Sequence, residues 1–375
     1  MNLLTIDTPS FILDEGIMDA NIDRMRAQAE KLGVTLRPHL KTSKCWDVAK
    51  RQMSTPQGPV TVSTLKEAEE FAAHGVTDMI YAVGIAPQKL SRVAALYEKG
   101  VDLKIILDNV AAAKAVSDFC QKHNYAFKVL IEIDCDGHRS GLKPNDPEIV
   151  NVAKAILAPA VVAGVITHAG GSYDVDTPAA LLKRAQGERD GINTAAALLK
   201  EAGYGCPIVS VGSTPTALYA DHLEGVTELR AGVYVFFDLF QAGVGSCQIK
   251  DIAVSLLVTV IGHQKEKGWI ITDGGWMAMS RDRGTANQKV DQGYGLVCDV
   301  EGRPIDGLWM SSANQEHGII SARDGHALNL DDFPVGTRLR ILPNHACPFA
   351  AQHPKYFVVN GSIEVKDVWN RFYGW

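Results

Sequence analysis

Between about residues 35 and 235, short runs rich in β-branched residues alternate with longer segments of helical composition. This alternation predicts parallel βαβ units, because each helix returns the chain to the start of the next strand. Eight such units in about 200 residues favour a closed (β/α)8 barrel over an open doubly wound sheet. The candidate strands are Val34–Arg37, Val60–Val62, Met79–Val83, Leu103–Leu107, Phe127–Ile133, Val161–Thr167, Ile208–Val211 and Thr227–Phe236.

After about residue 246 the pattern changes to short strands separated by turn residues, with little helix. This pattern predicts a second, mainly antiparallel β domain. We place the barrel at residues 10–245 and the β domain at residues 246–375 together with 1–9. Ser10–Leu13 precedes the first barrel strand and is expected to pair with the β domain. The candidate strands of this domain are Ser255–Ile261, Gly268–Thr272, Gly293–Val300, Arg338–Leu342 and Tyr356–Asn360.

Charge and hydropathy exclude several classes of partner. The net charge is −6 and no basic tract is present, which argues against nucleic acid or an anionic membrane. No apolar run is long enough to span a bilayer, and the N-terminus lacks the basic start of a secretory signal. Seven cysteines without CxxC spacing are typical of a reduced protein. We therefore expect a cytoplasmic protein that acts on a small molecule.

Lys41 lies just beyond the first candidate strand, in the run Arg37-Pro-His-Leu-Lys-Thr. Pro38 ends ladder hydrogen bonding, so the lysine follows the C-terminal end of the strand, where a barrel carries its chemistry. A lysine there is either a solvated surface charge or the residue that forms a Schiff base with a carbonyl cofactor.

Two glycine-containing turns follow the seventh and eighth strands, where barrels commonly bind phosphate. In Ser210-Val-Gly-Ser-Thr-Pro-Thr, Gly212 lets the backbone approach an anion, while Ser213 and Thr214 add hydroxyl donors. The alternative is an ordinary helix cap. The second turn runs Arg230-Ala-Gly-Val-Tyr and contributes Gly232, Val233 and Tyr234.

Further polar residues follow other strands or lie near the C-terminus. Arg139 follows strand five, and His168 and Tyr173 follow strand six. His345 and Cys347 are two residues apart, so in an extended segment their side chains point to the same side. Nitrogen and sulfur ligands together suit Zn²⁺, although two protein ligands rarely hold a metal unaided.

Several motifs in the same order resemble the family of D-threonine aldolases and eukaryotic-type D-serine dehydratases, which are pyridoxal-phosphate enzymes of the alanine-racemase-like fold. The motifs span the chain, and the third residue of HxC resembles the dehydratase branch, because aldolases tend to have aspartate there. The motifs are RPHLKTSK, EIDCDGHRSG, THAGGSY, VGSTPT and PNHACP.

The resemblance implies a role for each candidate residue. Lys41 carries pyridoxal 5'-phosphate, Arg139 pairs with its phenolate oxygen, and His168 stacks on its ring near Tyr173. Arg230 meets the pyridine nitrogen, with an ion pair to Glu228 or Asp238 as the structural alternative. The HxC pair holds a divalent metal, zinc in preference to manganese or magnesium. Relatives form homodimers, so we expect a homodimer.

The implied activity is the dehydration of a D-3-hydroxy amino acid to a 2-oxo acid and ammonia. D-Serine, D-threonine and 3-hydroxy-D-aspartate remain open as substrates, and Arg281 or Arg283 is a candidate carboxylate ligand. Retro-aldol cleavage to glycine and an aldehyde is the first alternative. A racemase would need a second base, usually a tyrosine. A non-enzymatic cofactor-binding protein would be a single barrel without the HxC domain.

Overall fold

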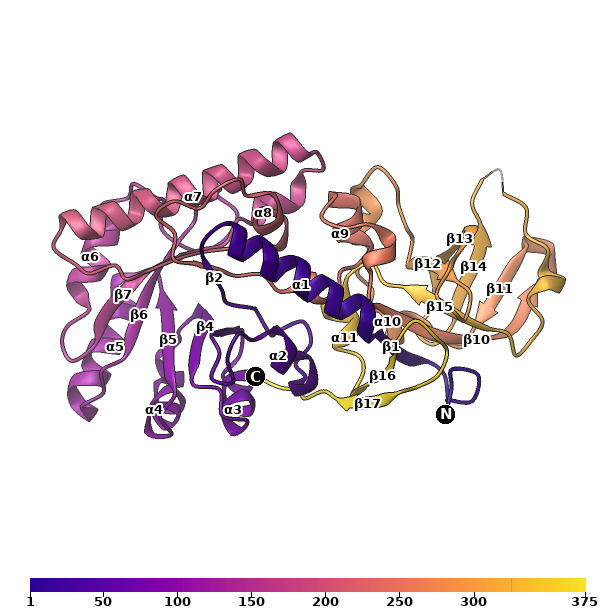
Figure 1. Cartoon of the computed structure of the whole chain (residues 1–375), viewed down its shortest axis with the longest axis horizontal. Helices are drawn as coiled ribbons and strands as arrows, with labels where there is room; N and C mark the ends of the chain where they lie inside the picture. The colour runs from indigo at the N-terminus through magenta and orange to yellow at the C-terminus, as the bar shows by residue number, and fades with distance from the viewer. Residues whose placement is uncertain (325) are drawn as a thin grey trace. The chain divides into compact units, whose positions relative to one another are not determined.

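The strand–helix alternation forms an eight-stranded parallel sheet in the order β2–β9–β8–β7–β6–β5–β4–β3 (Figure 1). The two end strands are joined by a parallel bridge between His39 and Thr61, where Leu40 N–H donates to Thr61 O at 2.9 Å. The predicted closed barrel is therefore confirmed. The strands are β2 (Thr35–Leu36), β3 (Val60–Val62), β4 (Asp78–Gly84), β5 (Asp102–Leu107), β6 (Lys128–Ile133), β7 (Val161–Thr167), β8 (Ile208–Val211) and β9 (Glu228–Leu229).

A helix follows each strand from β2 to β8, and the strands are buried because helices cover them. Ile80, Ile106 and Leu130 belong to one core cluster of this sheet. The helices are α2 (Trp46–Gln52), α3 (Leu65–Ala73), α4 (Leu90–Glu98), α5 (Val110–His123), α6 (Glu148–Ala155), α7 (Pro178–Glu201) and α8 (Thr214–Tyr219).

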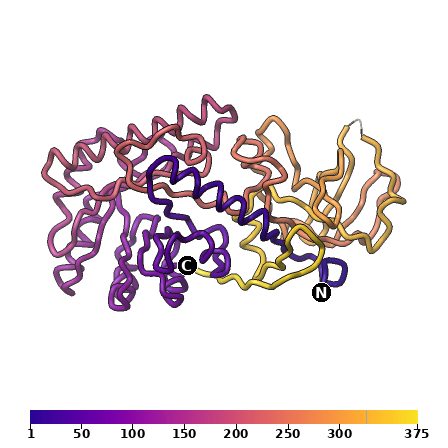
Figure 2. Tube along the Cα trace, in the orientation of Figure 1, coloured from indigo at the N-terminus to yellow at the C-terminus, as the bar shows by residue number. Residues whose placement is uncertain are grey.

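The computed structural model describes residues 1–324 and 326–375, and contacts divide it into two units. The barrel unit comprises Arg24–Gly232 with Gly374–Trp375, and the second unit comprises Met1–Asp23 with Val233–Tyr373. Figure 2 traces the chain from α1 (Glu15–Lys31), which begins in the second unit and ends in the barrel unit. This division differs from the predicted limits, residues 10–245 and 246–375 with 1–9, because the segment from Val233 onward groups with the second unit.

The predicted strand Thr227–Phe236 is wrong beyond its first residues. Only Glu228–Leu229 is a strand, and Val233–Val235 forms a 3₁₀ turn. All three residues of this turn are buried. A short apolar run has the same appearance whether it is a buried strand or a buried turn, so periodicity could not separate the two.

The second unit contains a nine-stranded, mainly antiparallel sheet in the order β11–β14–β13–β12–β15–β10–β1–β16–β17, and β10 also pairs with β11. β1 pairs with β10 as expected. The alternation of β13, β14 and β17 was not recognised in the sequence, because glycine, serine and charged residues interrupt it. The strands are β1 (Ser10–Asp14), β10 (Val254–Gln264), β11 (Trp269–Thr272), β12 (Gly295–Cys298), β13 (Pro304–Ala313), β14 (Gly318–Ala322), β15 (Arg338–Leu342), β16 (Lys355–Val359) and β17 (Asp367–Asn370).

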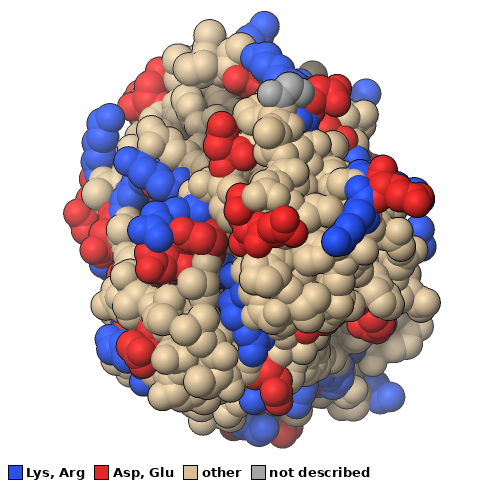
Figure 3. Space-filling model, turned by 90° about the vertical axis from the view of Figure 1, so that its right-hand side faces the viewer, with Lys and Arg blue, Asp and Glu red and all other residues tan. Residues whose placement is uncertain are grey.

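Three short helices complete the second unit: α9 (Leu239–Val244), α10 (Trp276–Met279) and α11 (Ala346–Ala350). On the face shown in Figure 3, lysines and arginines are interspersed with acidic side chains, as expected for a chain without a basic tract. Within residues 1–324 and 326–375, no helix is long and apolar enough to cross a membrane.

Candidate functional site

Lys41 lies in the turn after β2, and its side chain is exposed. The turn is fixed by its neighbour His39. Lys41 N–H donates to His39 Nδ1 at 3.5 Å, and His39 Nε2 lies 3.2 Å from Ser63 Oγ. Because Nδ1 accepts a hydrogen bond, Nε2 carries the proton of the neutral ring. No separate role was predicted for His39 from the sequence.

Two histidines of the barrel unit share one cationic environment. Burial is the main cause that lowers the pKa of His39 and His168, and the charges of Lys41, Arg139 and Arg230 lower both further. The pKa of His168 falls to about 3. Both rings are therefore neutral near pH 7. Four predicted residues are therefore close together: Lys41, Arg139 and His168 from three strand-to-helix loops, and Arg230 from the segment directly after β9.

The tautomer of His168 follows from its hydrogen bond. Its Nδ1 lies 2.8 Å from the carbonyl oxygen of Gly212, and a carbonyl can only accept, so Nδ1 carries the proton. Nε2 is left as an acceptor. The ring of Tyr173 lies with its centroid 6.1 Å from that of His168, so the structure brings these two predicted residues together.

Arg230 is a buried cation held by neutral oxygens. Its guanidinium donates to Ser210 Oγ and to Thr167 O. Burial lowers its pKa to about 10, against the opposing charges of Glu228 and Glu188. The alternative of a direct ion pair with Glu228 is not what the hydrogen bonds show.

Glu228, which does not pair with Arg230, pairs instead with Arg37. Arg37 Nε lies 2.8 Å from Glu228 Oε2, and its Nη1 lies 2.8 Å from Asp78 Oδ1. These two carboxylates offset the cost of burying the Arg37 charge, whereas the hydrogen bonds of Arg230 go to neutral oxygens. The arginine of the RPHLKTSK motif therefore has a structural partner set inside the barrel.

Arg139 follows β6 and remains half exposed, with 54% of its side-chain surface accessible. Its Nη2 lies 3.5 Å from Glu132 Oε1. Ser140 Oγ donates to the other oxygen of Glu132 at 3.0 Å. Arg139 thus stands at the edge of the site, where a ligand can reach it.

The predicted phosphate turn after β8 contains one unused hydroxyl. Gly212 has φ +148°, and a Cβ there would lie 1.7 Å from Arg230 O, so only glycine fits. Its N–H donates to Glu188 Oε1 at 2.9 Å rather than remaining free. Ser213 caps α8 through Thr216 N–H. Thr214 Oγ1 is buried and has no hydrogen-bond partner within the described ranges.

The second glycine turn is divided between the two units. Gly232 lies in the barrel unit, where a Cβ would be 3.2 Å from His39 Cβ. Val233 and Tyr234 belong to the second unit and are buried. Pyridoxal phosphate fits the barrel residues: an orphaned buried hydroxyl, exposed Lys41 and two arginines complement an anion bearing an aldehyde.

Glu188 was missed, although the sequence contains a signal for it. It lies on α7 in a stretch with several charged residues. However, its spacing from Leu181, Ala185 and Ile192 places it on the buried face of the helix. A charged residue on an apolar stripe was the available clue.

In the second unit, His345 and Cys347 are in direct contact. His345 ends an extended segment, and α11 begins at the next residue, so the assumed extended conformation through Cys347 is wrong. The two side chains nevertheless hydrogen-bond to each other. His345 has extended dihedral angles, and Cys347 lies in the first turn of α11.

Acidic residues surround this pair. His345 Nδ1 lies 2.7 Å from Asp282 Oδ2, and Asp238 Oδ2 accepts from Ala346 N–H at 2.8 Å. Burial lowers the pKa of His345, but Asp282, Cys347 and Asp238 outweigh it and raise the pKa well above its usual range. The environment therefore favours a positive charge.

The donor set fits a divalent metal only as an open site. Among the described residues, no group of three or more His, Cys, Asp or Glu side chains is arranged to hold a metal ion. His345 and Cys347 supply one nitrogen and one sulfur, a combination that suits zinc. Asp282 occupies Nδ1, which leaves Nε2 as the ligating atom.

The two predicted carboxylate ligands differ in how they are held. Arg283 lies 2.7 Å from Asp291 and stacks on Tyr294. Arg281 lies over the ring of Trp276, 5.1 Å from its centroid. A role of either arginine in substrate binding stays a prediction.

Comparisons with known proteins match both units. Residues 13–239 match the family described as alanine racemase, N-terminal domain, and residues 253–359 match the putative serine dehydratase domain. The D-threo-3-hydroxyaspartate dehydratase of Delftia sp. (strain HT23) is 52% identical over 100% of this chain and 99% of its own. Its solved structure superimposes with a TM-score of 0.96 and covers 100% of both chains.

More distant relatives carry two activities. The D-serine dehydratase of Dictyostelium discoideum is 28% identical over 96% of this chain and 95% of its own. The D-threonine aldolase of Arthrobacter sp. is 28% identical over 98% of this chain and 92% of its own. The matches run through the whole chain, barrel and β unit alike. This chain therefore belongs to the alanine-racemase-like family that includes the D-serine dehydratases and D-threonine aldolases.

Proposed function

We propose that this protein is a pyridoxal-phosphate- and metal-dependent dehydratase of D-3-hydroxy amino acids, with 3-hydroxy-D-aspartate as its preferred substrate. One observation carries the chemistry: Lys41, Arg139 and Arg230 lie close enough to His39 and His168 for their charges to add to the effect of burial. Together they keep both histidines neutral beyond the ends of the strands. The choice of substrate rests on the 52% identity to the Delftia dehydratase.

The barrel residues would hold the cofactor. Lys41 would form the covalent link, and Ser213 and Thr214 would bind the phosphate together with the turn of Gly232, Val233 and Tyr234. Arg139, His168, Tyr173 and Arg230 would contact the ring. When bound, pyridoxal phosphate stabilises the negative charge left at Cα after a proton is removed.

Lys41 is also the residue that would take the α-proton. Its side chain is exposed in the turn after β2, so a bound amino acid would be able to approach it. His39 and His168 are neutral. His39 accepts a hydrogen bond at Nδ1, and His168 donates one from Nδ1. They orient the site rather than compete for the proton.

Dehydration requires help for the hydroxyl, because hydroxide is a poor leaving group. A divalent metal, with zinc as first candidate, supplies a Lewis acid for that oxygen. His345 Nε2 and Cys347 Sγ would hold it. One structure of the D-threo-3-hydroxyaspartate dehydratase is described as a cysteine-to-alanine mutant in the metal-free form. A second carries a histidine-to-alanine change two residues earlier in that protein, the spacing of His345 and Cys347.

The net reaction conserves all atoms. Water lost in the elimination returns in the hydrolysis, so the D-3-hydroxy amino acid gives a 2-oxo acid and ammonium. Retro-aldol cleavage at the same site would instead give glycine and an aldehyde.

The test is to incubate the purified protein with pyridoxal phosphate and Zn²⁺ or Mn²⁺ on D-serine, D-threonine and 3-hydroxy-D-aspartate. Ammonia and glycine are assayed in the same reaction. Ammonia with a matching 2-oxo acid, fastest for 3-hydroxy-D-aspartate, is the expected result. Glycine with an aldehyde would contradict the proposal and establish an aldolase. Light scattering of the same preparation tests the expected homodimer.

A further inference from the structure

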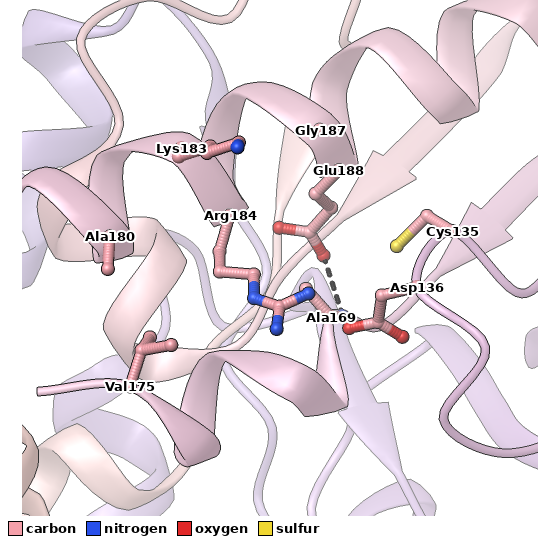
Figure 4. Close-up of a pocket in the computed structure, with 9 residues that line it drawn as sticks. All are labelled: Cys135, Asp136, Ala169, Val175, Ala180, Lys183, Arg184, Gly187 and Glu188. Carbon is pink, nitrogen blue, oxygen red and sulfur yellow. Dashed lines mark hydrogen bonds between the residues drawn. The ribbon is translucent and has the colours of Figure 1, made fainter.

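Glu188 is a buried carboxylate that joins two strand-to-helix loops. The side chain is 3% exposed. Its Oε1 accepts the N–H of Ala169 at 3.1 Å and the N–H of Gly212 at 2.9 Å. Figure 4 shows the carboxylate directed from α7 toward Ala169. One oxygen therefore fixes the loop after β7 to the loop after β8.

A second contact closes these bonds into a ring. Ala169 directly follows His168, whose Nδ1–H donates to Gly212 O at 2.8 Å. Gly212 is thereby held at both its N–H and its carbonyl. Neither loop can shift without breaking a hydrogen bond to the other or to Glu188.

The same carboxylate also reaches the start of α8. The Thr216 side chain hydrogen-bonds to Glu188, and Ser213 N–H donates to Thr216 Oγ1 at 3.2 Å. The turn that contains Ser213 and Thr214 is thus connected to Glu188 through one intervening side chain. A buried carboxyl group is tolerated only when donors satisfy it, and here the donors come from the two loops and from the first turn of α8.

A cavity lies beside the Glu188 side chain. Its volume is about 420 Å³, and its lining includes Glu188, Arg184, Asp136 and Cys135 (Figure 4). Truncation of Glu188 would enlarge this cavity, and the amides of Ala169 and Gly212 would lose their protein acceptor.

We propose that Glu188 is a positioning residue that holds His168 and the turn of residues 212–214 in the geometry that binds the cofactor. This inference rests on the proposed function, because it assumes that both loops contact pyridoxal phosphate. Glu188 itself touches neither cofactor nor substrate in this role.

The experiment compares Glu188→Ala with Glu188→Gln in titrations of the cofactor-free protein with pyridoxal phosphate, followed by steady-state kinetics. The glutamine oxygen can still accept both amides, and its amide group can face Thr216. We expect Glu188→Ala to weaken cofactor binding by at least about tenfold, because two buried amides lose their hydrogen-bond acceptor. Glu188→Gln should remain within about threefold of wild type, since it keeps the acceptor.

Ser117→Ala is the matched control. Ser117 Oγ also bridges two backbone groups, donating to Ala155 O and accepting from Leu157 N–H, each at 2.8 Å. Ala155 and Leu157 precede the first residue of β7. They therefore lie at the N-terminal end of the barrel strands, opposite to the end that carries His168 and Gly212. Ser117→Ala should leave cofactor affinity unchanged even where it lowers the melting temperature.

Three results would overturn the inference. Wild-type cofactor affinity in Glu188→Ala would show that the ring is unnecessary. Equal losses in Glu188→Ala and Glu188→Gln would assign the effect to charge instead of position. An equal loss in Ser117→Ala would make it a general effect of stability. A wild-type protein that binds no pyridoxal phosphate would instead refute the proposed function itself.

Discussion

His168 in the barrel unit and His345 in the second unit are both partly buried, yet their pKa values shift in opposite directions. Burial and the charges of Arg139, Lys41 and Arg230 lower that of His168 to about 3. His345 experiences the same penalty of burial, but Asp282 and Cys347 reverse it. Burial lowers the pKa of both rings, and the neighbouring charges reinforce this effect at His168 but reverse it at His345.

The difference between the charges around His168 and those around His345 indicates which kind of ligand each site favours. An excess of cations around neutral rings favours an anion, such as a phosphate, a phenolate or a carboxylate. An imidazole beside a thiol and carboxylates favours a cation. The barrel unit is therefore suited to pyridoxal phosphate and an amino-acid substrate, and the second unit to a metal ion.

The largest expected effect follows from removing Lys41, the residue proposed to form the covalent link to pyridoxal phosphate. Lys41→Ala should abolish the visible absorbance band of the bound cofactor and lower turnover by about 10⁴-fold or more, because covalent attachment and the base are lost together. Lys50→Ala is the control, since Lys50 pairs with Asp47 on the surface. A visible band retained in Lys41→Ala would remove the covalent role.

Removing the thiol should separate the two sites. Cys347→Ala is expected to lower turnover by about 100-fold or more while the visible cofactor band persists, because only the metal is lost. Metal content is measured by mass spectrometry. Cys206→Ala, a half-buried thiol of the barrel unit, is the control. Full activity in metal-stripped Cys347→Ala protein would refute the metal role.

Except for the last, the barrel strands could be predicted from sequence to within one residue at each end. Buried parallel strands appear as continuous apolar runs between turn residues, and β3, β7 and β8 coincide with the predicted ranges. The polar residues that follow such strands converge by topology. Lys41, Arg139 and His168 could therefore be found without coordinates.

Sequence failed where distant segments decide the local conformation. The helix after His345 begins with Ala346, whose N–H is satisfied by Asp238, far away in the chain. No local pattern indicates that cap. Likewise, Glu188 accepts amides from two loops that sequence cannot place beside α7. The family resemblance supplied the roles of these regions but not their contacts.

Removing the charge of Asp282, whose carboxylate contacts His345, should lower metal affinity less than removing His345 or Cys347. Asp282→Asn keeps an acceptor for Nδ1–H but removes the charge that supports the imidazole. We expect zinc affinity to fall by about 10- to 100-fold, the usual effect of such a partner, as measured by competition with a chelator. Asp299→Asn, whose carboxylate pairs with Arg303 in the same unit, is the control. Unchanged affinity would show that Asp282 does not orient the ligand.

The smallest effect tests whether burial and the nearby cations keep His168 neutral in the cofactor-free protein. An unfolded histidine titrates near pH 6.5, and folding lowers the pKa of His168 to about 3. Between these values only the unfolded chain binds the proton, so stability falls as the pH falls below about 6.5, by at most about 1.4 kcal/mol per pH unit.

His168→Asn should remove this dependence. Between pH 7 and pH 5.5, the free energy of unfolding in urea should drop by about 1 kcal/mol less in the variant than in wild type. The same change at exposed His123 controls for the substitution itself. If His168→Asn and wild type lose stability in parallel, the barrel histidine is not held neutral by its surroundings. The contrast with His345 would then no longer indicate which ligand each site binds.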